Sequence, residues 1–245
     1  MKALLKLTWT EFKLQLREPV GTFFTLAFPL LLMILFGSIS GNEPEDFLGG
    51  FGQIDLSVAG YMAMVIGTIG MLGLPITLSN YREQGILRRL RATPLQSSTI
   101  LWSQVIVQVV MAGLGILLLV GAGRLLFGLR LPVGNLMIIP AVILSAFSFF
   151  AVGFALAGVM PSPRTAQAVG MAVFFPMLFL SGAAMPRFIM PETIQRIAEF
   201  LPLTQVVILL EDLWLSGTWN VTALLAVMAI FILGLVVSRY TFRWE

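Results

Sequence analysis

The sequence predicts a single all-α integral membrane domain over residues 1–245, with six transmembrane helices. Of the 245 residues, 58% are hydrophobic and only 11% are charged, whereas an average soluble domain is about 45–50% apolar and about 25% charged. The charges are also unevenly placed, because six stretches of at least 22 residues contain no Asp, Glu, Lys or Arg: 19–42, 56–81, 92–123, 131–163, 165–186 and 213–238. About 20 apolar residues are enough to cross the hydrocarbon core of a bilayer.

Residues 1–18 are expected to form an amphipathic helix that lies in the membrane interface. An apolar stripe and a polar stripe repeat at helical spacing, the first made of Leu5, Trp9, Phe12 and Leu16 and the second of Lys6, Thr10, Lys13 and Arg17. Such a helix buries its aromatic rings at the acyl boundary and leaves its cations among the headgroups. Packing of this helix against another protein segment is the alternative. Pro19 is expected to end the helix and turn the chain into the bilayer.

The six spans are expected at about 20–41, 57–79, 98–123, 134–160, 165–185 and 218–238. Pro29 and Pro75 fall within the first two spans, where proline bends a membrane helix but is tolerated. Small residues at four-residue spacing, such as Gly153 and Ala157, permit close contacts between helices. No expected span contains an ionisable residue, which argues against an ion-driven carrier.

The segment between the fifth and sixth spans, residues 186–212, is expected to form short outer re-entrant helices. Ile194, Ile197, Ala198 and Leu201 make one apolar face of a short helix. The charge-free run that follows, Phe200 to Leu210, has 11 residues and is too short to cross a bilayer. An irregular outer loop is the alternative.

The distribution of Lys and Arg predicts the orientation in the cell (inner) membrane. With the N-terminus inside, eleven cations lie on the cytoplasmic side: Lys2, Lys6, Lys13, Arg17, Arg82, Arg88, Arg89, Arg91, Arg164, Arg239 and Arg243. Four lie outside: Arg124, Arg130, Arg187 and Arg196. Because cytoplasmic loops carry the excess of Lys and Arg, both termini are expected to be cytoplasmic.

The composition excludes several kinds of chemistry. The sequence has no Cys and no His, so disulfides, thiolate nucleophiles, imidazole metal ligands and Ser-His-Asp triads are absent. Its three lysines, Lys2, Lys6 and Lys13, all precede the first glycine, Gly21, whereas a phosphate-binding loop needs a lysine after a glycine run. No catalytic site, metal or cofactor is therefore expected in this chain. A net charge of +3 gives no reason to expect nucleic-acid binding.

Residues 82–95, between the second and third spans, are expected to form an amphipathic cytoplasmic helix. Ile86, Leu87 and Leu90 form its apolar edge, and four arginines surround them: Arg82, Arg88, Arg89 and Arg91. Pro94 ends the helix. This arrangement suits docking of a cytoplasmic partner; the alternative is that the arginines serve only to orient the chain.

The same segment resembles the permease subunits of type-2 ABC exporters, the group that includes daunorubicin-type drug-resistance permeases. Their signature there is similar to Arg-Glu-x-Gly-x-Leu-x-Arg-Leu-Arg-Ala-Thr-Pro-Leu, and it is matched by Arg82-Glu83, Gly85, Leu87 and the run from Arg89 to Leu95. A second, looser likeness is a Leu-Ser-Gly element followed by prolines, at Leu180-Ser181-Gly182, Pro186, Pro191 and Pro202. The resemblance covers essentially the whole chain.

The resemblance implies a transport subunit that is not itself an enzyme. Such permeases dimerise, so a homodimer or a pair with a sister permease is expected, and they bind separate ATPase subunits that hold ATP and Mg²⁺. It assigns coupling to Arg82, Glu83, Arg88, Arg89 and Arg91, and an outer gate to residues around 187–210. It also implies a substrate pathway along the second and fifth spans, with these candidate wall residues: Met62, Ile66, Met171, Phe174 and Phe175. Lipid-facing or helix-packing positions are the alternative for each of them.

Two other functional classes compete with this interpretation. A membrane-embedded transferase or hydrolase needs clustered carboxylates or histidines, and the nearest cluster is Glu43, Glu45 and Asp46, which more often solvates a turn. A channel or assembly scaffold without nucleotide coupling is the other alternative. The sequence does not identify the substrate, since an uncharged surface rich in Met and Phe accepts drugs, lipids and lipid-linked molecules alike.

Overall fold

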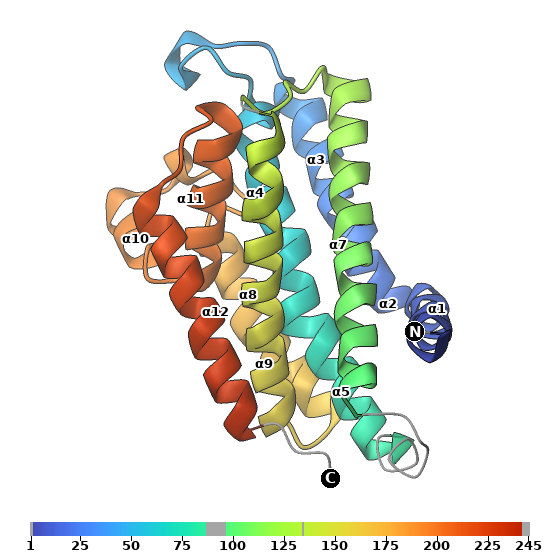
Figure 1. Ribbon diagram of the computed structural model, residues 1–245. Coiled ribbons are helices and arrows are strands. Elements are labelled where there is room, and N and C mark those ends of the chain that lie inside the picture. Colours follow the sequence, from blue (N-terminus) through green and yellow to red (C-terminus); the bar gives the residue numbers. More distant parts are fainter. Residues whose placement is uncertain (1, 87–96, 134, 242–245) are drawn as a thin grey trace.

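The computed structural model describes the chain apart from residues 1, 87–96, 134 and 242–245 (Figure 1). Within the described residues the protein is a bundle of helices without a β-strand, as predicted, and one isolated bridge joins Glu45 to Phe51. Five helical segments are long and apolar enough to cross a membrane: Phe23–Ser40, Gln53–Glu83, Thr99–Phe127, Ile138–Val159 and Val221–Thr241. They coincide with the first, second, third, fourth and sixth expected spans.

The helix α1 (Lys2–Arg17) lies across the bundle and not along it. Figure 1 views α1 end-on beside α7 (Ser97–Phe127), while the long helices run in the plane of the picture. We call the end of the bundle marked by Glu83, Val159 and Thr241 the basal end, and the end marked by Ser40, Gln53 and Val221 the apical end. The last helix, α12 (Val221–Thr241), runs from the apical end to the basal end.

The first two spans are each widened into a π-helical turn just before Pro29 and Pro75. In the first span, α2 (Pro19–Thr22) leads into η1 (Phe23–Ala27) and then α3 (Phe28–Ser40), which carries Pro29. The second span is built from α4 (Gln53–Thr68), η3 (Ile69–Gly73) and α5 (Leu74–Glu83), which carries Pro75. The proline ring clashes with the carbonyl four residues earlier and donates no hydrogen bond, so the preceding turn opens to i→i+5 bonding.

The second span is the central helix of the bundle, and most of its residues are buried. It packs against α3, α7, α8 (Ile138–Val159), α9 (Pro163–Leu180) and α11 (Pro202–Leu215). Glycines make this crowding feasible, because a Cβ at Gly70 would lie 2.6 Å from the carbonyl oxygen of Phe149 on α8, and one at Gly60 would lie 2.6 Å from that of Gly182. Small residues therefore set the helix separations around the central span.

The helix α9 occupies the place of the fifth expected span, 165–185, but it ends earlier, at Leu180. Its 18 residues measure about 27 Å, and Arg164 and Gln167 lie in its first turns. It is not among the five segments that are apolar enough to cross. The helix stops because Gly182 adopts a positive φ of 90° and the chain turns toward Pro186.

The apical segment contains two short helices, α10 (Glu192–Ala198) and α11, after the single turn η5 (Arg187–Ile189). The expected apolar face of α10 is largely not buried: Ala198 is covered, whereas Ile197 is 61% exposed. The helix that packs into the bundle is α11, which buries Leu203, Val206, Leu210 and other side chains against α4 and α12. Its 14 residues start two residues later than the charge-free run and extend past it through Glu211 and Asp212.

Candidate coupling and transport site

A buried polar cluster joins three helices near the basal end. Tyr81 of α5 donates its hydroxyl hydrogen to the Glu11 carboxylate of α1. Gln104 of α7 donates through Nε2 to Glu11 Oε2 at 2.9 Å and to the Tyr81 hydroxyl oxygen at 3.4 Å. Burial raises the pKa of Glu11, and the hydrogen bonds from Tyr81 and Gln104 lower it only in part. This cluster ties α1 to the ends of the second and third spans.

Arg82 is committed to the neighbouring helix α8. Its Nη2 donates to the carbonyl oxygen of Ala157 at 2.8 Å and also to that of Met160. Carbonyls at the C-terminal end of a helix have no partner within it, and a cation there interacts favourably with the helix dipole. Arg82 therefore holds α5 to α8 through Nη2, and its predicted role in coupling stays a prediction.

The first two residues of the expected helix over 82–95 belong instead to the second span. Arg82 and Glu83 belong to α5, which continues the second span, and Gly85 follows with a φ of 65°. Glu83 is exposed at this end, and Ile86 packs against Tyr81 and Ile100. The predicted coupling residues Arg88, Arg89 and Arg91 lie outside the described residues.

A small cavity of about 180 Å³ lies between the first span, the π-helical turn of the second span and α9. Its polar lining comes from Gln15, Glu18, Thr25, Thr68 and Gln167, and its apolar lining includes Phe24, Leu72, Ile76 and Met171. The two widened turns, η1 and η3, both border this cavity. Such mixed linings suit a molecule with one polar and one apolar part.

The predicted wall residues separate into two groups. Met62, Ile66 and Phe174 are buried, and the Phe174 ring occupies the space where a Cβ at Gly67 would sit. Ile66 and Phe174 are core residues of the chain, because helices pack around the second span. Met62 also borders a separate, apolar hollow of about 400 Å³ between α7 and α8. Met171 does line the small cavity, and Phe175 is half-buried against Phe24, with ring centroids 6.4 Å apart.

The predicted interfacial helix presents three faces and not two. The exposed fractions of Leu5, Trp9 and Leu16 are 67%, 59% and 44%, so their apolar stripe is open to a surrounding bilayer. Phe12 packs partly against the core. The cations Lys6, Lys13 and Arg17 are exposed, and Lys13 lies 5.0 Å from the centre of the Trp9 ring. The third face is polar and buried, and it carries Glu11 and Gln15.

Comparison with known proteins decides the family. Residues 2–215 match the model of the family described as ABC-2 type transporter. This chain belongs to the ABC-2 type transporter family. A relative from Porphyra purpurea, named "Putative transport permease ycf38", is 24% identical over 208 residues, which are 84% of this chain and 72% of the relative. A protein of the same name from Pyropia yezoensis is 27% identical with the same coverage.

Membership has three direct consequences. An ABC-2 permease is the transmembrane subunit of an ABC transporter. The family and the five apolar segments together indicate a multi-pass membrane protein. Proteins of this family normally pair with ATPase subunits, and the permeases are generally not enzymes themselves.

Two residues of the basal cluster in this ABC-2 permease were missed by the sequence analysis. Glu11 is the single acidic residue before Glu18, and it belongs to neither stripe of the first helix. Gln104 interrupts the apolar third span together with Gln108. A buried polar side chain needs a hydrogen-bonding partner, so a carboxylate on a third face and glutamines within a span are signals that could have suggested this cluster.

At the apical end of the ABC-2 permease, Asp55 organises two loops. Its carboxylate accepts hydrogen bonds from the backbone N–H of Gly52 and of Arg130, at 3.2 and 2.9 Å, and from Asn42 Nδ2 at 3.2 Å. The Arg130 guanidinium adds a longer ionic contact of 3.8 Å. The side chain of Asp55 is 1% exposed, so these donors depend on it.

Replacing Asp55 by alanine is expected to lower the free energy of unfolding by about 1–3 kcal/mol, because the amide donors around it lose their shared acceptor. Thermal unfolding of the purified permease in detergent measures this loss. Asp46→Ala is the matched control, since Asp46 is an exposed carboxylate on the same apical loop. Equal melting temperatures for both variants would contradict the role of Asp55.

The stability of the permease is also expected to depend on pH through Glu211, in the last turns of α11. Burial raises the pKa of Glu211 to about 7; the charge of Arg187 opposes this shift and that of Asp212 adds to it. The folded state then binds this proton more tightly than the unfolded state, so stability rises as the pH falls from about 7 toward 4.5. Glu211→Gln should flatten the melting temperature over that window, and an unchanged slope would exclude Glu211 as the source.

Proposed function

We propose that this chain is the permease of an ATP-driven exporter that moves an amphiphilic drug, lipid or lipid-linked molecule outward, coupled to a separate nucleotide-binding subunit. The observation that carries the proposal is the match of residues 2–215 to the ABC-2 type transporter family. The position of the lysines supports it, because none of the three follows a glycine run, so ATP and Mg²⁺ would be held by the partner.

The basal cluster offers a path for force from such a partner. A subunit that pushes on the segment after Glu83 acts directly on α5, which is clamped to α8 by Arg82 and to α1 by the contact of Tyr81 with Glu11. These clamps make the basal ends of three helices move together. The π-helical turn η3, just above α5, is where the central helix has its irregular backbone, and such turns frequently accompany function.

A homodimer completes the transport pathway in this proposal. The cavity of about 180 Å³ is smaller than the roughly 300–1,000 Å³ of sites that enclose drug-sized ligands. A second copy, facing the same helices across a two-fold axis, would double it and close its open side. Closed two-fold symmetry is the commonest arrangement of soluble homo-oligomers, and α9 would then serve as the sixth span beside this pathway.

The orientation follows from the charges. Eleven of fifteen cations fall on the side that holds both termini when six spans are counted, so the basal end would face the cytoplasm. The helices α10 and α11 would then dip into the outer leaflet and form the outer gate, because 14 residues of helix measure only about 21 Å.

The test is reconstitution of this permease with its candidate ATPase. We expect the two to co-purify, and ATP hydrolysis in proteoliposomes should be stimulated by an amphiphilic substrate that accumulates on the apical side. Flux through liposomes that contain this chain alone would instead support a channel. Co-purification without substrate-stimulated hydrolysis would support an assembly scaffold.

Glu83→Lys is expected to lower substrate-stimulated ATP hydrolysis by on the order of tenfold, a typical coupling free energy between sites, while membrane insertion stays normal. Glu83 is exposed at the basal end, next to the residues proposed to meet the ATPase. Glu45→Lys, an exposed carboxylate on the apical loop, is the control. Normal transport by the Glu83→Lys permease would rule out the coupling role of this residue.

A further inference from the structure

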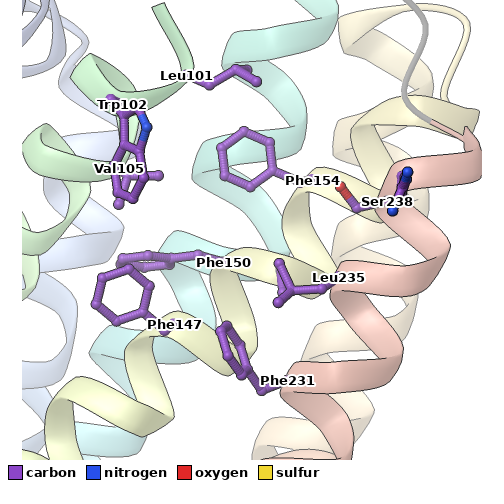
Figure 2. Close-up of a pocket in the computed structure, with 11 residues that line it drawn as sticks. Leu101, Trp102, Val105, Phe147, Phe150, Phe154, Phe231, Leu235 and Ser238 are labelled. Atoms are coloured by element: carbon purple, nitrogen blue, oxygen red, sulfur yellow. The ribbon is translucent and has the colours of Figure 1, made fainter. Parts of the chain in front are cut away.

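A second and larger hollow lies on the outside of the bundle, away from the proposed pathway. This basal groove encloses about 560 Å³ between α7, α8 and α12. Figure 2 shows Trp102 and Val105 of α7 on one side and Leu235 and Ser238 of α12 on the other, with Phe147, Phe150 and Phe154 of α8 between them. Nearly all of its lining is apolar, and it opens toward the surface that faces the bilayer.

The floor of the basal groove is rigid. The helices α8 and α12 touch closely, since a Cβ at Gly234 would lie 2.9 Å from the backbone of Ala151. At the basal end a Cβ at Gly158 of α8 would lie 2.6 Å from the backbone of Thr241, whose hydroxyl group is shared between the carbonyl oxygens of Val237 at 2.9 Å and Ala155 at 3.2 Å. The Phe150 side chain is 1% exposed and forms part of the floor. A groove with such a floor persists without an occupant and is preformed for one.

The polar groups of the basal groove are gathered at one end. Ser238 and Arg239 lie in the last turn of α12, and Arg239 is the charged residue among those that line the groove. Trp102, which is 57% exposed, is the sixth residue of α7 and lies at the same end. Tryptophan and arginine are the residues that mark the headgroup level of a membrane protein. The apolar lining, from Phe154 to Phe147, then extends toward the middle of the bilayer.

The chemistry of the groove favours a lipid, because a single cation and a hydroxyl group lie at one end of an otherwise apolar surface. Phe231 and Arg239, at the two ends of the groove on α12, are eight residues or about 12 Å apart. Each methylene group of an acyl chain that is buried there contributes about 0.8 kcal/mol.

We propose that the basal groove is a binding site for an anionic phospholipid from the leaflet at the basal end. The phosphate lies at Arg239 and Ser238, and one acyl chain runs over Phe154 and Phe150 to Phe147. The lipid fills the space between α7 and the α8–α12 pair and holds α7 in place. This proposal does not rest on the proposed function, because it requires only the groove and a bilayer around the bundle.

Native mass spectrometry of the purified chain tests the site, with phosphatidylglycerol and phosphatidylcholine of identical acyl chains as probes. The wild-type chain should retain one phosphatidylglycerol in preference to phosphatidylcholine. Arg239→Gln should lower retention of phosphatidylglycerol about fivefold, the effect of one cation near a lipid headgroup, without changing phosphatidylcholine. Val105→Trp, which fills the groove from α7, should lower retention of both lipids.

Two matched variants control for general effects. Arg164→Gln removes an exposed cation at the same end of the bundle, and Val110→Trp enlarges an exposed residue of α7 that lines no part of the groove. Equal retention of the two lipids by the wild-type chain, or equal losses in Val105→Trp and Val110→Trp, would overturn the proposal. So would displacement of the bound phosphatidylglycerol by inorganic phosphate.

A second copy of the chain in the groove is the competing occupant, and the absence of cysteine from the sequence makes it easy to detect. Leu235→Cys introduces one thiol on the rim of the groove. Oxidation in vesicles should leave this variant monomeric if a lipid occupies the groove. A disulfide-linked dimer would show that a second chain sits there and would overturn the lipid site.

Discussion

Gly153→Val is expected to remove most of the folded permease from the membrane fraction. A Cβ at Gly153 of α8 would lie 2.4 Å from the carbonyl oxygen of Gly70 in the π-helical turn of the second span. The same two helices also meet one turn away, since a Cβ at Gly70 would lie 2.6 Å from the carbonyl oxygen and 2.8 Å from the carbonyl carbon of Phe149. Both neighbours are backbone atoms of buried helices, which cannot rotate away as a side chain can.

The expected loss is large because the clash lies beside the central helix. Overpacking a buried site costs about 1–3 kcal/mol where side chains can adjust, so we expect a loss of at least about 3 kcal/mol for Gly153→Val. The yield and melting temperature of the detergent-extracted permease measure it. Gly113→Val in α7 is the control, because a Cβ there meets no atom within 4 Å. Similar yields for the two variants would contradict this account.

Small residues and prolines were the features of the sequence that predicted local structure best. The pairing of Gly153 with Ala157 predicted a close helix contact, and Gly153 does make one. The spacing of small residues does not identify the partner helix, however, and Gly153 meets the carbonyl of Gly70 within the π-helical turn that precedes Pro75. Proline predicted a bend, but whether the helix kinks or forms a π-helical turn depends on the helices packed around it.

The predicted pathway residues show why apolar spans hide their orientation. A span that is apolar all round carries no amphipathic signal to separate the lipid-facing side from the packed side. Ile66 was expected at a cavity wall, yet the second span packs against five helices and this side chain is buried, whereas Met62 borders a hollow between α7 and α8. Met171, on the less enclosed α9, does reach a cavity. Only the packing arrangement distinguishes these positions.

The first helix shows the opposite case, in which a strong amphipathic pattern conceals a second function. Its apolar stripe, apart from Phe12, and its cationic stripe are exposed on the surface of the protein. Glu11 and Gln15 lie buried one turn apart on the remaining face, and Glu11 attaches the helix to the bundle through Tyr81 and Gln104. A sequence pattern shows the two widest faces of an interfacial helix most clearly, so a narrow third face that binds the rest of the protein is easily overlooked.

Glu11→Ala is therefore expected to detach α1 from the ends of the second and third spans and to uncouple transport. The Tyr81 hydroxyl and the Gln104 amide lose their shared acceptor in a buried position, which costs about 1–3 kcal/mol. If α1 and α5 move together, substrate transport by the reconstituted complex should fall on the order of tenfold, while binding of the ATPase is retained. Glu11→Gln keeps a hydrogen-bonding side chain and should lose less.

A double-mutant cycle separates this coupling from simple destabilisation. Residues in one hydrogen-bond network show interaction energies of about 0.5–3 kcal/mol, so Glu11→Ala combined with Tyr81→Phe should cost clearly less than the sum of the two single changes. Thr10→Ala is the control on α1, because the exposed Thr10 hydroxyl donates to the carbonyl of Lys6 in its own helix. Additive losses, or an equal fall in transport for Thr10→Ala, would mean that the buried carboxylate does not link α1 to the bundle.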